Sequence, residues 1–87
     1  MSHKNEKYLP LLAKINELAL TAPNKLQIFV YYSPHVQSID VSIFKDGWTD
    51  GANPDARATA YLDWENGFEQ LEAVLRLAVT YTLEAHQ

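Results

Sequence analysis

Two stretches in the first half of the chain, Leu26–Tyr32 and Ser38–Phe44, have a period-two pattern of side chains. Successive side chains of a strand point to opposite faces. Residues such as Ile28 and Val41 therefore line one aliphatic face. The sequence Ser33–His35 between the stretches contains proline and is typical of a turn. Two β-rich stretches joined by a short turn predict an antiparallel hairpin.

A third, weaker strand is predicted at Arg57–Leu62, where Ala58 and Ala60 alternate with larger residues. Alanine is uncommon in strands, so this element has the weakest signal of the three. The Asp46-Gly47 pair before it is a tight-turn sequence. Residues 49–56 carry Gly, Asn and Pro and are expected to form a loop.

A helix is predicted at about residues 7–21, ahead of the strands. Its apolar residues recur at the i, i+3, i+4, i+7 spacing of one helical face. Pro10 suits the first turn, where the missing N–H costs nothing. Pro23 and Asn24 mark the end of the helix.

A longer helix is predicted from Phe68 to about residue 84, because the same periodicity returns there. Asn66 and Glu69 have the spacing of a capping box, in which each side chain bonds the backbone N–H of the other residue. Asp63 is the competing cap.

The order of elements predicts an α+β fold: a helix, a three-stranded antiparallel meander and a helix, with both helices packed on one face of the sheet. We expect one domain over residues 1–87, with residues 1–6 as a disordered tail. The aliphatic sheet face and the helix stripes should form the core. Its expected members are Ile28, Val30, Ile39, Val41, Ile43 and Leu62 from the sheet, and Leu11, Leu12, Ile15, Leu18, Phe68, Leu71, Leu75 and Ala78 from the helices.

Composition removes several classes of function. The 87 residues include no cysteine, which excludes disulfides, thiol catalysis and cysteine-ligated metal. The longest apolar runs are far shorter than the 18 or so residues of a membrane span. The N-terminal apolar run Leu9–Ala13 is short and contains proline, so we expect no secretory signal and a cytoplasmic protein.

Charge is unevenly distributed along the chain. Residues 1–45 carry five lysines and three acids, a net charge of +2, whereas residues 46–87 carry two arginines and eight acids, a net charge of −6. Phosphate binding needs clustered Lys and Arg. We therefore expect no nucleic-acid partner, and the acidic half is most simply a solvated surface.

Metal and cofactor sites find little support in the sequence. His3, His35 and His86 lack the short spacings of metal ligands. Aligning Gly51 with the turn glycine of a calcium loop places Arg57 where the bidentate glutamate belongs, so an EF-hand is excluded. A looser cation site on this loop stays open. We predict no cofactor and no metal.

Catalytic pairs are equally weak. Ser33 and His35 are neighbours in a turn without an orienting carboxylate. Asp63 and Glu65 precede a helix, where acids usually interact with its dipole. We expect a protein that is not an enzyme. The alternative is a small ligand-binding domain or enzyme with its site near the 46–65 loop.

The second face of the predicted sheet combines aromatic residues with a single arginine, a composition enriched at protein interfaces. An ordinary half-hydrated sheet face with cross-strand aromatic pairs would look the same. A platform for single-stranded nucleic acid also uses aromatics, but the acidic charge disfavours it. The candidate interaction residues are Phe29, Tyr31, Asp40, Trp48, Arg57, Tyr61, Leu77 and Tyr81.

Leu77 and Tyr81 are in this set because they widen the apolar stripe of the second helix beyond what one sheet face needs. The stripe of the first helix is already used on the sheet. We therefore expect a homodimer or a protein partner, with either the aromatic face or this helix flank as the contact.

The segments Ile39–Trp48 and Tyr61–Glu65 give the chain a resemblance to small accessory proteins encoded by phages and mobile elements. Such proteins often pair a short helix–three-strand–helix plan with an acidic loop. The resemblance spans roughly residues 26–84. It implies a role in partner binding, such as inhibition of a host factor.

Overall fold

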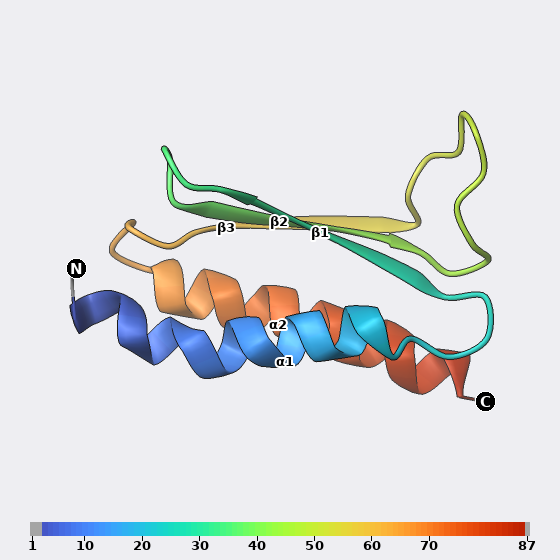
Figure 1. The fold of residues 1–87 in the computed structure, drawn as a ribbon, viewed down its shortest axis with the longest axis horizontal. Coiled ribbons are helices and arrows are strands. Elements are labelled where there is room, and N and C mark those ends of the chain that lie inside the picture. Colours follow the sequence, from blue (N-terminus) through green and yellow to red (C-terminus); the bar gives the residue numbers. More distant parts are fainter. Residues whose placement is uncertain (1–2, 87) are drawn as a thin grey trace.

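The computed structural model describes residues 3–86 and has the predicted α+β fold. A 3-10 helix, η1, precedes the first α-helix. The elements in order are η1 His3–Tyr8, α1 Leu9–Leu20, β1 Gln27–Ser33, β2 Ser38–Phe44, β3 Ala56–Tyr61 and α2 Gly67–Ala85. Both helices lie on one side of the sheet (Figure 1). The predicted elements are confirmed, with ends shifted by one or two residues.

The N-terminal helix differs most from its prediction, because it begins at Leu9 rather than near residue 7. Pro10 has no N–H to donate, so the helical bonding pattern cannot extend back through it. The chain before it forms the tighter η1. Residues 1–2 of the tail predicted to be disordered lie outside the described residues, and η1 occupies the remainder.

The three strands form an antiparallel meander in the order β1-β2-β3. Val41 at the centre of β2 is paired with Val30 on one side and Ala58 on the other. Ile39 and Ile43 lie on the same face as Val41, because strand side chains alternate. This aliphatic face is the one that the helices cover.

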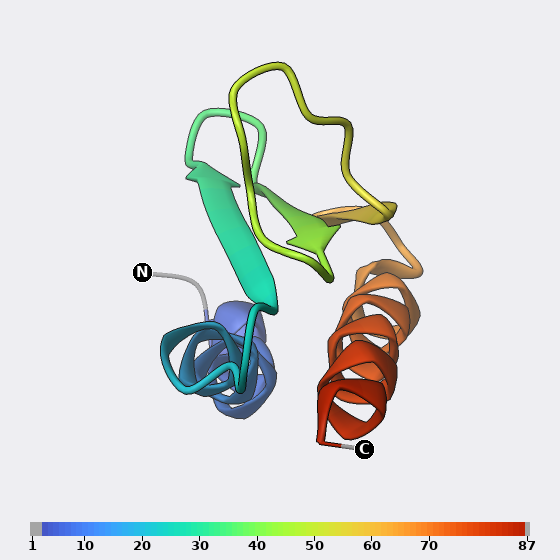
Figure 2. The ribbon, with the colours of Figure 1, turned by 90° about the vertical axis from the view of Figure 1, so that its right-hand side faces the viewer.

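Helix α1 packs against β1 and α2 against β3, and the two helices also contact each other (Figure 2). The core prediction is confirmed in its main members. Ile15, Ile28, Ile39, Val41, Ile43, Leu62, Leu71 and Ala78 are buried, and Val30, Leu11, Leu12, Leu18, Phe68 and Leu75 are partly buried against them. Tyr8 is also buried, and its hydroxyl donates to the carbonyl oxygen of Leu62 at 2.8 Å.

The outer edge of β3 is tied to α2. The N–H of Tyr61 donates to Oε1 of Gln70 at 2.8 Å and therefore points away from β2. The next N–H, of Leu62, donates to the carbonyl of Gln37 at 2.8 Å and points back toward β2. These two bonds establish which backbone groups face outward along the sheet.

The predicted capping box at the start of α2 is wrong. Asn66 is the N-cap residue, but its side chain makes no bond to the backbone of the first turn. Its Oδ1 instead accepts a hydrogen bond from Nε2 of Gln70 at 2.8 Å. A Cβ on Gly67 would lie 2.6 Å from the carbonyl oxygen of Leu62, so glycine permits the close approach of α2 to the end of β3.

Candidate functional site

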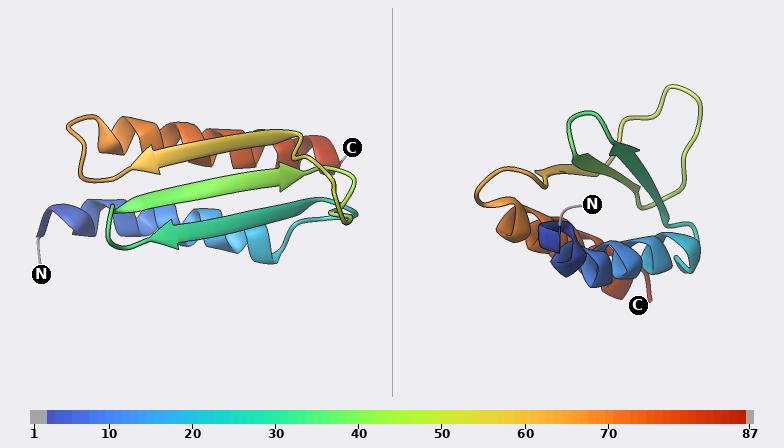
Figure 3. Two further views of the ribbon diagram at one scale, coloured as in Figure 1. Left: turned by 90° about the horizontal axis from the view of Figure 1, so that it is seen from above. Right: turned by 60° about the vertical axis from the view of Figure 1, so that its left-hand side comes forward.

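The sheet face opposite the helices gathers most of the predicted interaction residues. The helices lie beneath the sheet when it is seen from above (Figure 3, left). We call this surface the open face. Its rows across the three strands are Phe29–Ser42–Arg57, Tyr31–Asp40–Thr59 and Ser33–Ser38–Tyr61.

Asp40 is the polar centre of the open face. Its carboxylate accepts from Nη2 of Arg57 at 2.8 Å and from Nε at 3.4 Å. The hydroxyl of Thr59 lies 3.2 Å from the same carboxylate and donates to it. The hydrogen bond from Arg57 lowers the pKa of Asp40, helped by Thr59 and opposed by partial burial. The carboxylate likewise raises the pKa of Arg57. Each charge thus neutralises the other.

An aromatic cluster lies on the β1 side of this centre. The ring of Phe29 is 6.4 Å from that of Tyr31 and 5.3 Å from that of Phe44, measured between centroids. Tyr31 remains 56% exposed. Tyr31 is therefore the solvent-exposed ring of the cluster, and Phe29 packs against it.

By alternation along β2, Phe44 belongs to the open face, but it is buried. Phe29 packs against its ring, and the loop after β2 is hydrogen-bonded to the first residue of β1 at this end of the sheet. The N–H of Trp48 donates to Oε1 of Gln27, the cross-strand partner of Phe44, at 2.6 Å. The loop rises from the open face in Figure 1, and it holds Trp48 50% exposed.

A second aromatic pair lies at the opposite corner. Tyr61 and Trp64 stack with centroids 4.5 Å apart and ring planes 13° from parallel. Trp64 is 56% exposed and was not among the predicted residues. Its position follows from the turn after β3. There the N–H of Trp64 donates to the carbonyl of Tyr61 at 3.2 Å, and this bond brings the two rings together.

Leu77 and Tyr81 are not part of the open face. They lie on α2, partly buried against the core. Tyr81 also lines a cavity of about 360 Å³ with Lys45, Asp46, Glu84 and Ala85. The structure thus brings together Phe29, Tyr31, Asp40, Arg57 and Tyr61, places Trp48 at their rim, and separates Leu77 and Tyr81 from them.

The 46–65 segment, the alternative location for a ligand site, contributes only Asp46 to that cavity. Lys45 and Asp55 are used structurally: the N–H of Lys45 donates to Oδ2 of Asp55 at 2.8 Å. Among residues 3–86, no three side chains of the His, Asp or Glu type lie close enough together to hold a metal ion.

In the described range 3–86, no helix combines the length and the apolar character needed to cross a bilayer. No protein family, curated protein or solved structure matches the chain.

Proposed function

We propose that this chain is a non-enzymatic interaction module that binds a protein partner through the open face. One observation carries the proposal: the open face has the exposed ring of Tyr31 beside the Asp40–Arg57 ion pair, and the segments that follow β2 and β3 add the exposed rings of Trp48 and Trp64. Aromatic side chains bury much apolar area for little loss of conformational freedom, and they dominate the energetics of interfaces.

The Asp40–Arg57 pair makes the centre of this surface suitable for burial. An isolated charge buried under a partner is costly, whereas a charge that already has its hydrogen-bonded counter-ion loses much less. Because Arg57 is the arginine of this face and is held by Asp40, phosphate groups find little free positive charge here. These features favour a protein over a nucleic acid as the partner.

The chemistry of the partner follows from the rim. Asp46, Asp50 and Asp55 lie in the loop at one end of the sheet, and Asp63 and Glu65 lie at the other end. We expect a partner with an apolar centre and basic side chains around it, since complementary charge speeds association and aligns the two surfaces. The resemblance to phage and mobile-element accessory proteins favours a cytoplasmic host protein, inhibited or modulated by this contact.

A comparison of variants tests this function. The tagged protein and the double variant Tyr31→Glu with Trp64→Glu are each used to capture partners from cytoplasmic extract. Both positions are exposed, so the fold should survive, and circular dichroism checks this. The control is Leu83→Glu, at a 61% exposed position on α2.

The partner should be retained by the parent protein and by Leu83→Glu, but not by the double variant. With the purified partner, the dissociation constant should rise by roughly 100-fold or more, because two aromatic contacts are replaced by carboxylates. Equal binding of all three proteins, or no specific partner for any of them, would refute a role for the open face.

A further inference from the structure

The outer edge of β1 has a row of backbone groups directed away from the sheet. Since Tyr61 directs its N–H outward and Leu62 inward, the register assigns the remaining residues by alternation. On β1, the residues that face away from β2 are Ile28, Val30 and Tyr32. Their three N–H and three C=O groups have no protein partner among the described residues.

This edge lacks the usual protection against strand pairing. Natural edge strands are blunted by charged residues, proline, bulges or very short length. β1 has seven residues, none charged and none proline, and its register with β2 is continuous. The β3 edge differs, because Gln70 occupies one of its outward N–H groups and Arg57 places a charge on it.

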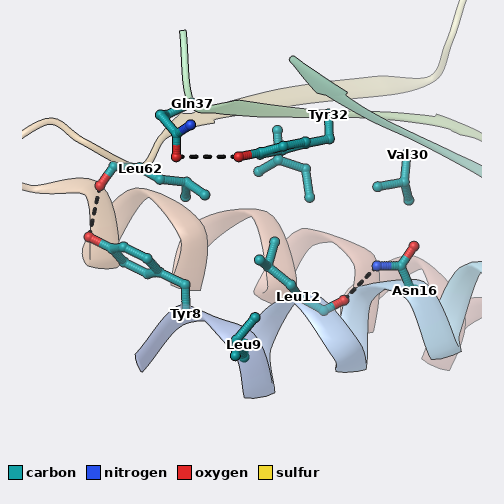
Figure 4. A pocket seen from close by; sticks show the side chains of 9 residues that line it. Tyr8, Leu9, Leu12, Asn16, Val30, Tyr32, Gln37 and Leu62 are labelled. Carbon is teal, nitrogen blue, oxygen red and sulfur yellow. Dashed lines mark hydrogen bonds between the residues drawn. The ribbon is translucent and has the colours of Figure 1, made fainter. Parts of the chain in front are cut away.

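An apolar groove of about 390 Å³ runs between this edge and α1. Figure 4 shows Val30 of β1 above Asn16 of α1, Leu12 directed from α1 toward the sheet, and the ring of Tyr32 extending toward Gln37. The polar groups in the groove are engaged locally. Nδ2 of Asn16 donates to the carbonyl of Leu12 at 2.9 Å, and the Tyr32 hydroxyl lies 3.3 Å from Oε1 of Gln37. An apolar occupant therefore suits the groove better than a polar ligand.

Helix α1 continues this apolar surface to its C-terminal end. At about 100° per residue, Leu9, Asn16 and Leu20 fall on one side of the helix, the side that lines the groove. Leu20 is 86% exposed. Seen from above, α1 crosses beneath β1, so that its C-terminal end extends past the strand edge while its N-terminal half is set back (Figure 3, left).

We propose that the β1 edge pairs with the β1 edge of a second copy of this chain, joining two three-stranded sheets into one of six strands. The strands are antiparallel and related by a two-fold axis through Val30. Val30 then pairs with its own copy, and Ile28 pairs with Tyr32 of the other copy. Six backbone hydrogen bonds form, and the helices of both copies lie on the same side of the joined sheet.

The register follows from the ends of the edge. The N–H of Leu26 already donates to the carbonyl of Pro23 at 3.1 Å, and Pro34 has no N–H. A register shifted by two residues in either direction would pair Leu26 or Pro34 with an outward-facing residue of the other copy, and neither has a free N–H to donate. Centring on Val30 is the arrangement that uses all six free groups and neither of these positions.

The tilt of α1 argues for a second copy rather than a foreign strand. Helix α1 runs opposite to β1, so Leu20 lies toward the Ile28 end of the edge and the Leu9–Tyr32 part of the groove toward the other end (Figure 3). The two-fold axis exchanges these ends. Leu20 of each copy, protruding past its own strand, then faces the groove of the other. A strand from another protein would bond the free N–H and C=O groups of the β1 edge but would leave Leu20 exposed.

Sedimentation equilibrium of the full chain from about 1 to 100 μM tests this pairing. The parent protein should be a dimer. Leu20→Glu should weaken the dimer roughly 100-fold or more, because it inserts a carboxylate into an apolar groove. Leu20 is almost fully exposed in a single copy, so the change should not lower the melting temperature of the monomer. Leu83→Glu, the same change at an exposed leucine of α2, should leave the dimer unchanged.

Val30→Pro tests the backbone contact itself. The N–H that it removes is unpaired in one copy, and proline is tolerated at such edge positions. This variant should be a folded monomer. A parent protein that is monomeric at 100 μM would overturn the proposal and leave the edge to another protein. A dimer that is unchanged by Leu20→Glu would also overturn the proposal. So would a dimer that dissociates only with the changes Tyr31→Glu and Trp64→Glu, because that result would place the contact on the open face.

Discussion

Neighbouring residues of β2 belong to two surfaces with different requirements. Val41 is fully buried between the sheet and the helices, whereas Asp40 and Ser42 lie on the open face. The covered face has aliphatic side chains that only another layer of the same chain can cover. The open face has side chains that satisfy one another, as Asp40 does with Arg57. The fold depends on the first surface, and the second is free to serve recognition.

The largest expected effect comes from placing the same charge on each face in turn. Val41→Asp buries a carboxylate without a partner and should lower the free energy of unfolding by about 4 kcal/mol or more, enough to unfold many domains of this size. Ser42→Asp, one residue away, lies beside Arg57 in the register and should change it by no more than about 0.5 kcal/mol. Denaturant titration followed by circular dichroism measures both.

Similar unfolding midpoints for these two variants would contradict the assignment of faces. A loss of stability in both would mean that the open face is covered in solution. The reverse result, with Ser42→Asp strongly destabilising and Val41→Asp nearly neutral, would mean that the two faces of β2 are exchanged, as a register shift of one residue would cause.

A smaller effect is expected where the helix layer meets the covered face. Gly67→Ala places a Cβ within 2.6 Å of the Leu62 carbonyl and 2.8 Å of the Tyr61 carbonyl, so α2 must move away from β3. We expect a loss of about 1–3 kcal/mol, measured by thermal and denaturant unfolding. Glu69→Ala, at an exposed position in the same first turn, is the control and should cost a few tenths of a kcal/mol.

The opposite result is also informative at this position. Replacing glycine by alanine normally stabilises a helix by restricting the unfolded chain. Stabilisation by Gly67→Ala would show that α2 does not approach the end of β3 as closely as the structure has it.

The smallest effect concerns the ion pair of the open face. The folded-state pKa of Asp40 is lowered, so its contribution to stability is complete above the unfolded pKa of about 3.9 and is lost as the pH falls through the folded value. The Arg57 side chain of the pair is 66% exposed, so solvent screens the interaction and the contribution is small. Asp40→Asn should melt slightly below the parent protein at pH 7. The difference should shrink as the pH falls below the unfolded pKa of about 3.9, and a difference independent of pH would contradict this origin.

The covered face was predictable because periodicity reports it directly. The core was identified by the period-two residues of Leu26–Tyr32 and Ser38–Phe44 and by the helical stripes. A strand of alanines fits because Ala58 and Ala60 lie on the face that the helices cover, beside larger residues of β2. Local pattern and tertiary burial agree there, so the fold could be read from the sequence.

The features that were missed depend on contacts between distant segments. Asn66 and Glu69 have capping-box spacing, but the side chain of Asn66 is bonded to Gln70. The same Gln70 side chain also accepts the N–H of Tyr61 at the edge of β3. Phe44 alternates like an exposed residue, yet it is buried, with the ring of Phe29 packed against it. Trp64 lies in a turn, where period-two reasoning does not apply, and its stacking on Tyr61 needs the turn geometry.

The bond between Gln70 and the Tyr61 N–H has a consequence for solubility at high concentration. If two copies join at β1, the only remaining sheet edges are the two β3 strands, one at each end. In each β3 strand the N–H of Tyr61 is already bonded to Gln70, and the side chain of Arg57 lies on the strand. A third copy would therefore gain few hydrogen bonds by pairing with this edge. Growth therefore stops at a closed pair rather than continuing into fibres, even though the sheet of each copy has two edges.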